Sequence, residues 1–384
     1  MLGTLALLLA QAAAPAASDE IVVVGNRAEK ALAECLARNC PPEAEVEMSL
    51  EASVEQFADG RYADARRTLR KALSRNKNHA ATMPGPISSL YATLATVAEH
   101  EGDTRLWRSA AWQNVEILRR YVGPDNLATL KEELSFADAM IGLGSPDTAD
   151  HVYQNVESKA RASGQDRLAA GATFRRAWLA LLRQREDDAE RLADEAVAAA
   201  GPNDPLMTQL RAILLTRIAV RRGDTQAVDA LASSLRQSAT ETPRLLFAPP
   251  VEDINGSDPG DSIHTSQRYD SQVRFGDIGY WIRPDGRTQD VEILRDSGLG
   301  QWQPGILRQI RARRYAPLDV EPGHPGLYRI DRFTIRGEVG QEIGSRIPRN
   351  TGRPTLHVID LTETDAMADA RNAQSGEAPA APMH

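Results

Sequence analysis

Cysteine, histidine and aromatic residues are scarce in this 384-residue sequence, which has two cysteines, seven histidines and 5% aromatic residues. The histidines are scattered, and none belongs to an HExxH or other paired-ligand pattern. No Gly-x-Ser-x-Gly nucleophile motif occurs, and Gly142 and Gly144 lack the spacing of a phosphate-binding loop. We therefore expect no catalytic residue, no metal site and no cofactor. An enzyme with an unrecognised site is the open alternative.

Lysine is also scarce, and dense basic clusters are missing. Only five lysines occur, and the formal net charge is −8. A net acidic chain without a basic cluster is not expected to bind nucleic acid. Residues 268–353 carry fifteen arginines and eleven acidic residues, so this part alone is mildly basic. We interpret that basic surface as solvated, with an acidic peptide or wall-associated partner as the alternative.

No apolar run approaches the roughly 20 residues needed to cross a bilayer. Residues 2–10 are apolar, and Ala14-Pro15-Ala16 follows as a cleavage pattern, which predicts a signal peptide over residues 1–16. The positive residues that normally precede the apolar core are missing, so we expect the true start upstream. The sequence thus predicts a periplasmic protein, or a membrane-anchored one if the upstream part lengthens the apolar segment.

The two cysteines, Cys35 and Cys40, lie in an N-terminal segment of residues 17–48. In an oxidising compartment such a pair closes a small loop, so we predict a disulfide bond. Two free thiols and half of a metal site are the alternatives.

Residues 49–243 are nearly all helical in pattern, with a recurring glycine. Gly60, Gly102 and Gly144 are 42 residues apart, Gln184 and Arg185 fill the fourth position, and Gly223 marks a fifth copy. A period of about 40 residues indicates stacked helical hairpins.

The first copy resembles a tetratricopeptide repeat in the spacing of Gly60, Tyr62, Ala65, Leu69 and Ala72. Residues 122–134 are similar to the repeat junction of kinesin light chains. The resemblance implies an α-solenoid of about five helix-turn-helix repeats whose groove binds partner proteins. A spacer or dimerisation surface is the alternative.

Residues 244–267 are dense in Pro, Gly, Asp and Ser and are predicted to be an interdomain linker. Asp253, Asn255 and Ser257 faintly resemble a calcium loop, but the glycine and the final glutamate are missing. Residues 363–384 are polar and rich in Ala and Pro, so a disordered tail is expected.

Residues 268–362 show a different pattern, which predicts a small α+β domain. Ile278, Tyr280 and Ile282 alternate as in a strand, and Pro284-Asp285-Gly286 predicts a tight turn into a second strand. Trp302, Ile306 and Ile310 recur at helical spacing, and residues 328–335 predict a further strand. A multidomain α+β protein with an N-terminal α-solenoid is therefore expected.

This order resembles the C-terminal domain of TonB, the periplasmic protein that grips outer-membrane transporters. The resemblance covers about a sixth of the chain and rests on Asp285-Gly286, Ser297-Gly298 and Tyr315-Ala316-Pro317 in that order. The family's Tyr-Pro pair is missing, because Tyr269 is followed by Asp270. The resemblance implies an exposed sheet edge that binds a partner's extended strand. The edge residues expected are Tyr328, Ile330, Phe333 and Ile335.

Near the start, Ile21, Val22, Val23 and Val24 form a β-favouring run that resembles the TonB box of receptors. We treat this run as a candidate strand donor for a sheet edge, with a simple packing strand or frayed end as the alternative. The sequence as a whole predicts a non-enzymatic adaptor of the cell envelope with protein partners. A membrane-anchored energy transducer resembling TonB is the alternative, and an envelope enzyme is the second.

Overall fold

The computed structural model describes residues 27–362, apart from residues 143, 202–203, 225, 236, 239–242, 252–272, 322 and 342–347. Four predictions lie outside the described residues. They are the signal peptide over residues 1–16, the strand donor at residues 21–24, the calcium-like residues 253–257 and the tail from residue 363.

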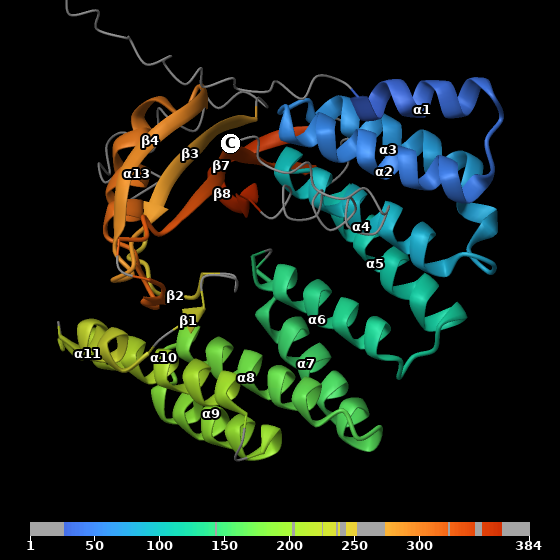
Figure 1. Ribbon diagram of the computed structural model, residues 1–384. Helices are drawn as coiled ribbons and strands as arrows, with labels where there is room; N and C mark the ends of the chain where they lie inside the picture. Colours follow the sequence, from blue (N-terminus) through green and yellow to red (C-terminus); the bar gives the residue numbers. More distant parts are fainter. Residues whose placement is uncertain are drawn as a thin grey trace, which may run out of the picture.

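Helices form the N-terminal part of the described chain (Figure 1). Their bounds are α1 (Arg27–Ala37), α2 (Pro42–Ala58), α3 (Tyr62–Asn76), α4 (Pro84–Glu101), α5 (Thr104–Tyr121), α6 (Leu127–Gly142), α7 (Pro146–Ala162), α8 (Asp166–Leu182), α9 (Glu186–Ala200), α10 (Pro205–Arg221) and α11 (Ala227–Ser234). A 3₁₀ turn, η1 (Lys77–His79), follows α3. The pairs α2–α3, α4–α5, α6–α7, α8–α9 and α10–α11 are the five expected helical hairpins.

Each hairpin turns at the position that the sequence period marks. Gly60, Gly102 and Gly144 have φ of 78°, 75° and 69°, a left-handed conformation that glycine adopts without steric cost. Gln184, at the fourth position, adopts the same conformation with φ of 61°. The left-handed turn thus recurs even where the glycine is replaced. The predicted TPR-like repeats are confirmed.

The spacing of small and apolar residues within the first hairpin is explained by packing. Ala65, Leu69 and Ala72 are completely buried, and Tyr62 is almost so. Alanines let α2 and α3 approach closely, and burying the Leu69 side chain contributes about 1.5–3 kcal/mol. These residues belong to a core that continues through the first four hairpins.

Cys35 and Cys40 form a disulfide bond, as predicted, with Cα atoms 5.1 Å apart. The bond closes the turn between the end of α1 and the start of α2. Replacing both cysteines by serine should lower the free energy of unfolding by about 2 kcal/mol, because a short loop of the unfolded chain is released. Urea denaturation measures this loss. Alkylation of the native protein at either cysteine, seen by intact mass without reductant, would contradict the bond.

The C-terminal part contains a four-stranded antiparallel sheet, so the predicted α+β domain is confirmed at this coarse level. Its strands β3 (Arg274–Ile282), β4 (Thr288–Ser297), β7 (Leu327–Gln341) and β8 (Pro348–Asp360) lie in the order β4-β3-β7-β8. The predicted helix is α13 (Gln303–Arg311), preceded by the 3₁₀ turn η2 (Gly300–Trp302). Ile278, Tyr280 and Ile282 share the sheet face that packs on Ile306 and Ile310 of α13.

The prediction that residues 328–335 form an edge strand is wrong for residues 331–335, whereas residues 328–330 pair only with β3 among the described strands. From Asp331 onward, β7 pairs with β8 on the side opposite β3, so it lies inside the sheet. Phe333 and Ile335 are buried against α13. Tyr328 and Ile330 alternate with them and point to the other face. The cause is strand β8. The sequence favours a strand only over residues 355–361, and the prolines, glycine and arginines before it give a weak β signal.

The end of the predicted solenoid and the first residues of the predicted linker also differ from expectation. Strand β2 (Leu245–Phe247) pairs with β5 (Arg314–Tyr315), and β1 (Gln237–Ser238) pairs with β6 (Leu318–Asp319). Leu246 is fully buried in a small core with Ile213 of α10 and Ala316. This stretch therefore joins the last helices to the C-terminal part rather than separating them.

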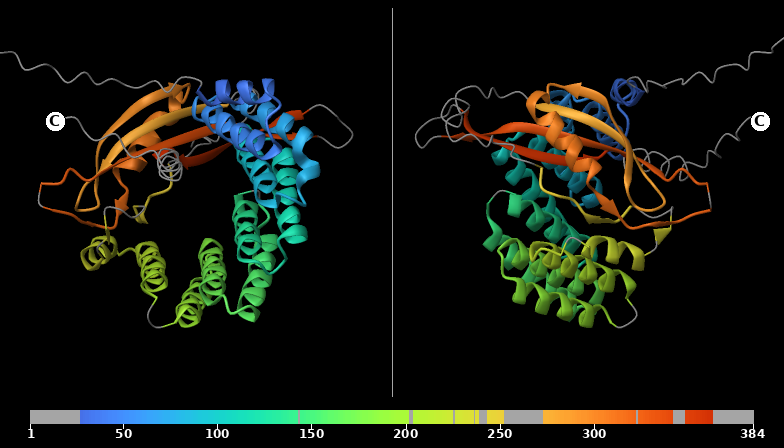
Figure 2. Two further views of the ribbon diagram at one scale, coloured as in Figure 1. Left: turned by 45° about the vertical axis from the view of Figure 1, so that its right-hand side comes forward. Right: turned by 90° about the vertical axis from the view of Figure 1, so that its left-hand side faces the viewer.

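The helices follow a curved path, and the C-terminal part lies between its two ends (Figure 2). One face of the sheet meets the first two hairpins through the Arg332 and His100 contacts described below. At the other end of the solenoid, Arg314 of β5 pairs with Asp229 of α11 at 2.9 Å. The C-terminal part thus bridges the first and last repeats of the solenoid.

Candidate functional site

A buried ion pair lies where the sheet meets the first hairpin. Arg332 of β7 is completely buried, and its Nε and Nη2 atoms lie 2.6 and 2.9 Å from the two carboxylate oxygens of Asp277 on β3. The same guanidinium donates to the carbonyl oxygens of Phe57 and Ala58 at 2.6 and 2.5 Å. These carbonyls lie at the end of α2. The Phe57 oxygen also accepts from the Gly60 N–H and the Ala58 oxygen from Arg295, so the Arg332 cation adds to these bonds and offsets the negative end of the helix dipole.

Two of the repeat glycines also make room for the sheet. The Phe275 ring of β3 lies against Gly60, and the Arg336 guanidinium of β7 occupies the space that a side chain on Gly102 would fill. Glycine at these positions therefore serves both the turn within the hairpin and the approach of the sheet.

His100, at the end of α4, connects the second hairpin to the sheet. Its Nδ1 atom lies 2.9 Å from Oγ1 of Thr334 on β7, and its ring packs edge-on against Phe57. Burial, and then the nearby His357, Arg332 and Arg336, lower the pKa of His100 to about 3. The imidazole is therefore neutral at physiological pH.

The lowered pKa of His100 predicts that acid weakens the protein. As the pH falls, the unfolded chain binds the proton near pH 6.5, whereas the folded chain does so only near 3. The His100 contribution is complete above pH 6.5 and should fall by about 2 kcal/mol at pH 5. Urea denaturation at pH 7 and pH 5 measures the change. In His100→Gln, the loss of stability between pH 7 and pH 5 should be about 2 kcal/mol smaller than in the parent chain. In the exposed control His151→Gln, the loss should equal that of the parent chain.

A cavity of about 560 Å³ opens beside this junction. It lies between helices α4 to α6 and strand β8. The helices and the sheet each contribute polar side chains and one aromatic ring, Trp107 and His357. The lining residues are Glu99, Thr104, Trp107, Asp138, Ala139, Gly142, Gly144, Arg336, Thr355, Leu356 and His357. We call this cavity the junction pocket.

Strand β8 borders the junction pocket and is one of the two outer strands of the sheet. Residues 354–360 pair in regular register with β7, and no described strand pairs with the other side of β8. Val358 is 47% exposed. An unpaired strand edge with an adjacent pocket can accept an extended polypeptide through main-chain hydrogen bonds, with the pocket selecting side chains.

The other face of the sheet holds a second buried polar cluster. Nη1 of Arg313 donates to the hydroxyl of Tyr280 at 2.8 Å, and that hydroxyl donates to Asp331 at 2.9 Å. Arg313 also pairs directly with Asp331. Because these groups satisfy one another within the core, we assign them to stability.

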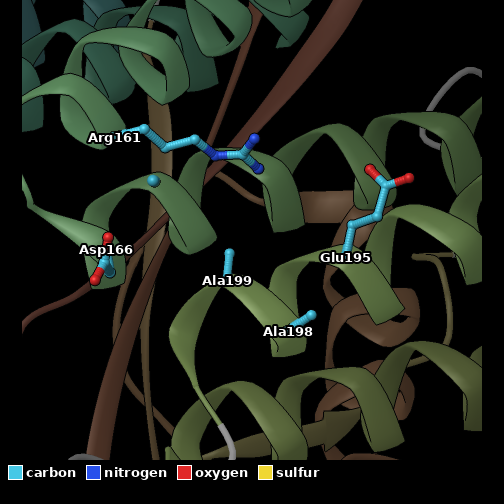
Figure 3. A pocket seen from close by; sticks show the side chains of 6 residues that line it. Arg161, Asp166, Glu195, Ala198 and Ala199 are labelled. Carbon is cyan, nitrogen blue, oxygen red and sulfur yellow. The ribbon is translucent and has the colours of Figure 1, made fainter.

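A depression of about 370 Å³ lies between α7, α8 and α9, with Arg161 and Glu195 reaching over it from different helices (Figure 3). The two charges that reach over it are already matched locally, since Arg161 pairs with Glu157 and Glu195 with Arg191. The junction pocket, with an open strand edge beside it, is therefore the stronger candidate.

The sequence predicted neither Asp277 nor Arg332, which hold the site together. The sequence offers one indication of them: each is a charged residue at a strand position where a buried side chain is expected. No group of three or more metal-ligating residues was found among the described residues. Within the same residues, no helix is both long and apolar enough to cross a membrane.

No protein-family model and no curated protein matches the chain. Among solved structures, BtubC from P. vanneervenii is similar at 18% identity, covering 54% of this chain and 86% of its own, with a TM-score of 0.42. A kinesin light chain of Podosopora anserina with TPR-like repeats is similar at 14% identity, covering 50% and 93%, with a TM-score of 0.41. The quorum sensor NprR from B. thuringiensis covers 54% and 57% at 13% identity, with a TM-score of 0.38.

Proposed function

We propose that this protein is a non-enzymatic adaptor of the cell envelope that binds an extended segment of a partner protein at the β8 edge. The observation that carries the proposal is the unpaired, regular edge of β8 beside the junction pocket. Main-chain pairing would supply affinity, and the pocket would select the partner's side chains.

The solenoid gives this site its second wall. Trp107 of α5 and Asp138 of α6 lie across the pocket from His357 of β8. A partner strand at the edge would therefore contact both parts of the chain at once. That arrangement fits an adaptor better than either a bare solenoid or a bare sheet.

The sequence resemblance to the TonB C-terminal domain supports the same proposal, with the binding edge moved from β7 to β8. The apolar residues 2–10 and the small residues that follow support export to the periplasm. The disulfide between Cys35 and Cys40 suits an oxidising compartment. N-terminal sequencing of the mature protein tests export, because a start near residue 17 or 18 is expected.

Photo-crosslinking in living cells tests the binding edge. A photoreactive amino acid at position 358 of β8 should yield a defined protein adduct, and one at position 294 of β4 should not. Leu294 is a matched control for Val358, because the two side chains are 46% and 47% exposed on the two outer strands. Equal adducts from both positions, or none from position 358, would refute the proposed edge.

A pocket-filling variant adds a second readout. A Cβ atom at Gly142 would meet no atom within 4 Å, and Gly142 lines the junction pocket, so Gly142→Leu should fill part of the pocket without disturbing the fold. Crosslinking from position 358 should fall by about tenfold. Gly85 is equally free of neighbours but lies outside the pocket, so Gly85→Leu should leave the yield unchanged.

A further inference from the structure

The second outer strand, β4, is also unpaired on one side in the described chain. It carries Leu294, a large apolar side chain that is 46% exposed. An open edge with exposed apolar residues invites pairing with another chain, and proteins usually cover or disrupt such edges. Among the described residues α13 packs on one face of β4, but no strand pairs with its outer edge, so an occupant of that edge would come from outside them.

The start of α1 lies close to this edge. The first three backbone N–H groups of α1 donate to the Glu55 carboxylate at 3.0, 3.1 and 3.3 Å, which fixes the start of α1 beside the last turn of α2. Ala58, about 4.5 Å further along α2, accepts a hydrogen bond from Arg295 of β4. The chain therefore enters α1 a short distance from β4.

The order of contacts across the sheet places α1 on the β4 side. The end of α4 meets β7 and β8 through Thr334 and His357. The end of α2 meets β7 and β4 through Arg332 and Arg295. The end of α2 therefore lies closer to β4 than the end of α4 does. Helix α1 packs against α2 (Figure 1).

The residues just before α1 suit a strand. Ile21, Val22, Val23 and Val24 are β-branched, and they lie only three to six residues before Arg27. An extended chain covers about 3.3–3.6 Å per residue, so the run can reach up to roughly 10–20 Å from the start of α1. The regular stretch of β4 nearest to Arg295 is Arg295 to Ser297, which pairs with β3 without a bulge. The four residues 21–24 are about as long as this three-residue stretch of β4.

We propose that residues 21–24 pair in cis with the outer edge of β4. The added strand covers Leu294 and closes this edge, so that β8 is the edge left open. A second copy of the chain pairing through β4, and a separate partner on β4, are the competing occupants that the experiment distinguishes.

Cysteine crosslinking tests the proposal in the full chain. Cysteine is placed at each of positions 21–24 in turn, together with either Ser297→Cys on β4 or Val358→Cys on β8, and joined by a short bismaleimide in dilute solution. The native Cys35–Cys40 pair is oxidised and does not react. Intramolecular adducts should form with position 297 at least about tenfold more than with position 358. Equal yields, a preference for position 358, or crosslinked dimers would overturn the proposal.

Hydrogen exchange gives an independent readout that needs no added cysteine. In the double variant Val22→Asp, Val24→Asp, amides of β4 that do not bond to β3 should exchange about tenfold faster than in the parent chain. Amides of β8 should be unchanged. Unchanged exchange at β4 would contradict the cis strand, while partner crosslinking from position 358 is a separate measurement and stays interpretable in either case.

Discussion

Arg332→Ala is expected to lower the free energy of unfolding by about 3–5 kcal/mol. The substitution leaves Asp277 buried without its bidentate partner, and it removes the donors to the Phe57 and Ala58 carbonyls at the end of α2. Arg295 still pairs with Asp277 at 2.6 Å, but its side chain is 41% exposed, so it offsets the desolvation of the buried carboxylate only in part. Urea denaturation of the parent and the variant measures the loss.

Two further variants separate this ion pair from a general effect of removing an arginine. Arg311 of α13 is exposed, so Arg311→Ala should change stability by less than about 0.5 kcal/mol. Replacing both partners, Arg332→Met with Asp277→Leu, should cost less than Arg332→Ala alone, because no charge is then left buried. A loss under about 1 kcal/mol for Arg332→Ala would show that the pair is solvated and does not join the sheet to the solenoid.

The helical repeats were predictable because their information is local. A turn residue every 42 residues and small residues at fixed offsets specify each hairpin within one segment of sequence. The fourth copy was placed from its spacing alone, and Gln184 there adopts the left-handed conformation of the glycines. Local geometry therefore explains why this part of the prediction succeeded.

The sheet edges were not predictable, because strand order depends on pairing between distant segments. The alternation in β3 identified the face that packs on α13. It could not show that β8 would pair with β7, since β8 has little β-branched content before Thr355. The predicted edge strand therefore became an interior one.

The junction was missed for the same reason. Asp277 and Arg332 are 55 residues apart, and Arg332 lies 274 residues from Ala58. Neither charge stands out along the sequence, where arginine is common. Only the folded chain brings the second face of the sheet against the ends of α2 and α4, and the candidate site exists only at that contact.

Gly60→Ala is expected to lower the free energy of unfolding by about 2–5 kcal/mol. The left-handed φ of 78° costs an alanine about 1–2 kcal/mol. A Cβ atom would also lie 2.4 Å from the Phe275 ring, which is buried in the main core and has to move. Such overpacking costs about 1–3 kcal/mol more.

Gly144→Ala is the matched control for Gly60→Ala, because Gly144 occupies the same position of its hairpin with φ of 69° and has no atom within 4 Å of a Cβ. Urea denaturation should show only the backbone cost of about 1–2 kcal/mol there. The difference between the two variants isolates the contact between the first hairpin and the sheet. Phe275→Leu in the Gly60→Ala background should recover part of that difference, since a smaller side chain relieves the overlap. Equal losses at Gly60 and Gly144 would mean that the sheet does not press on the first hairpin in solution.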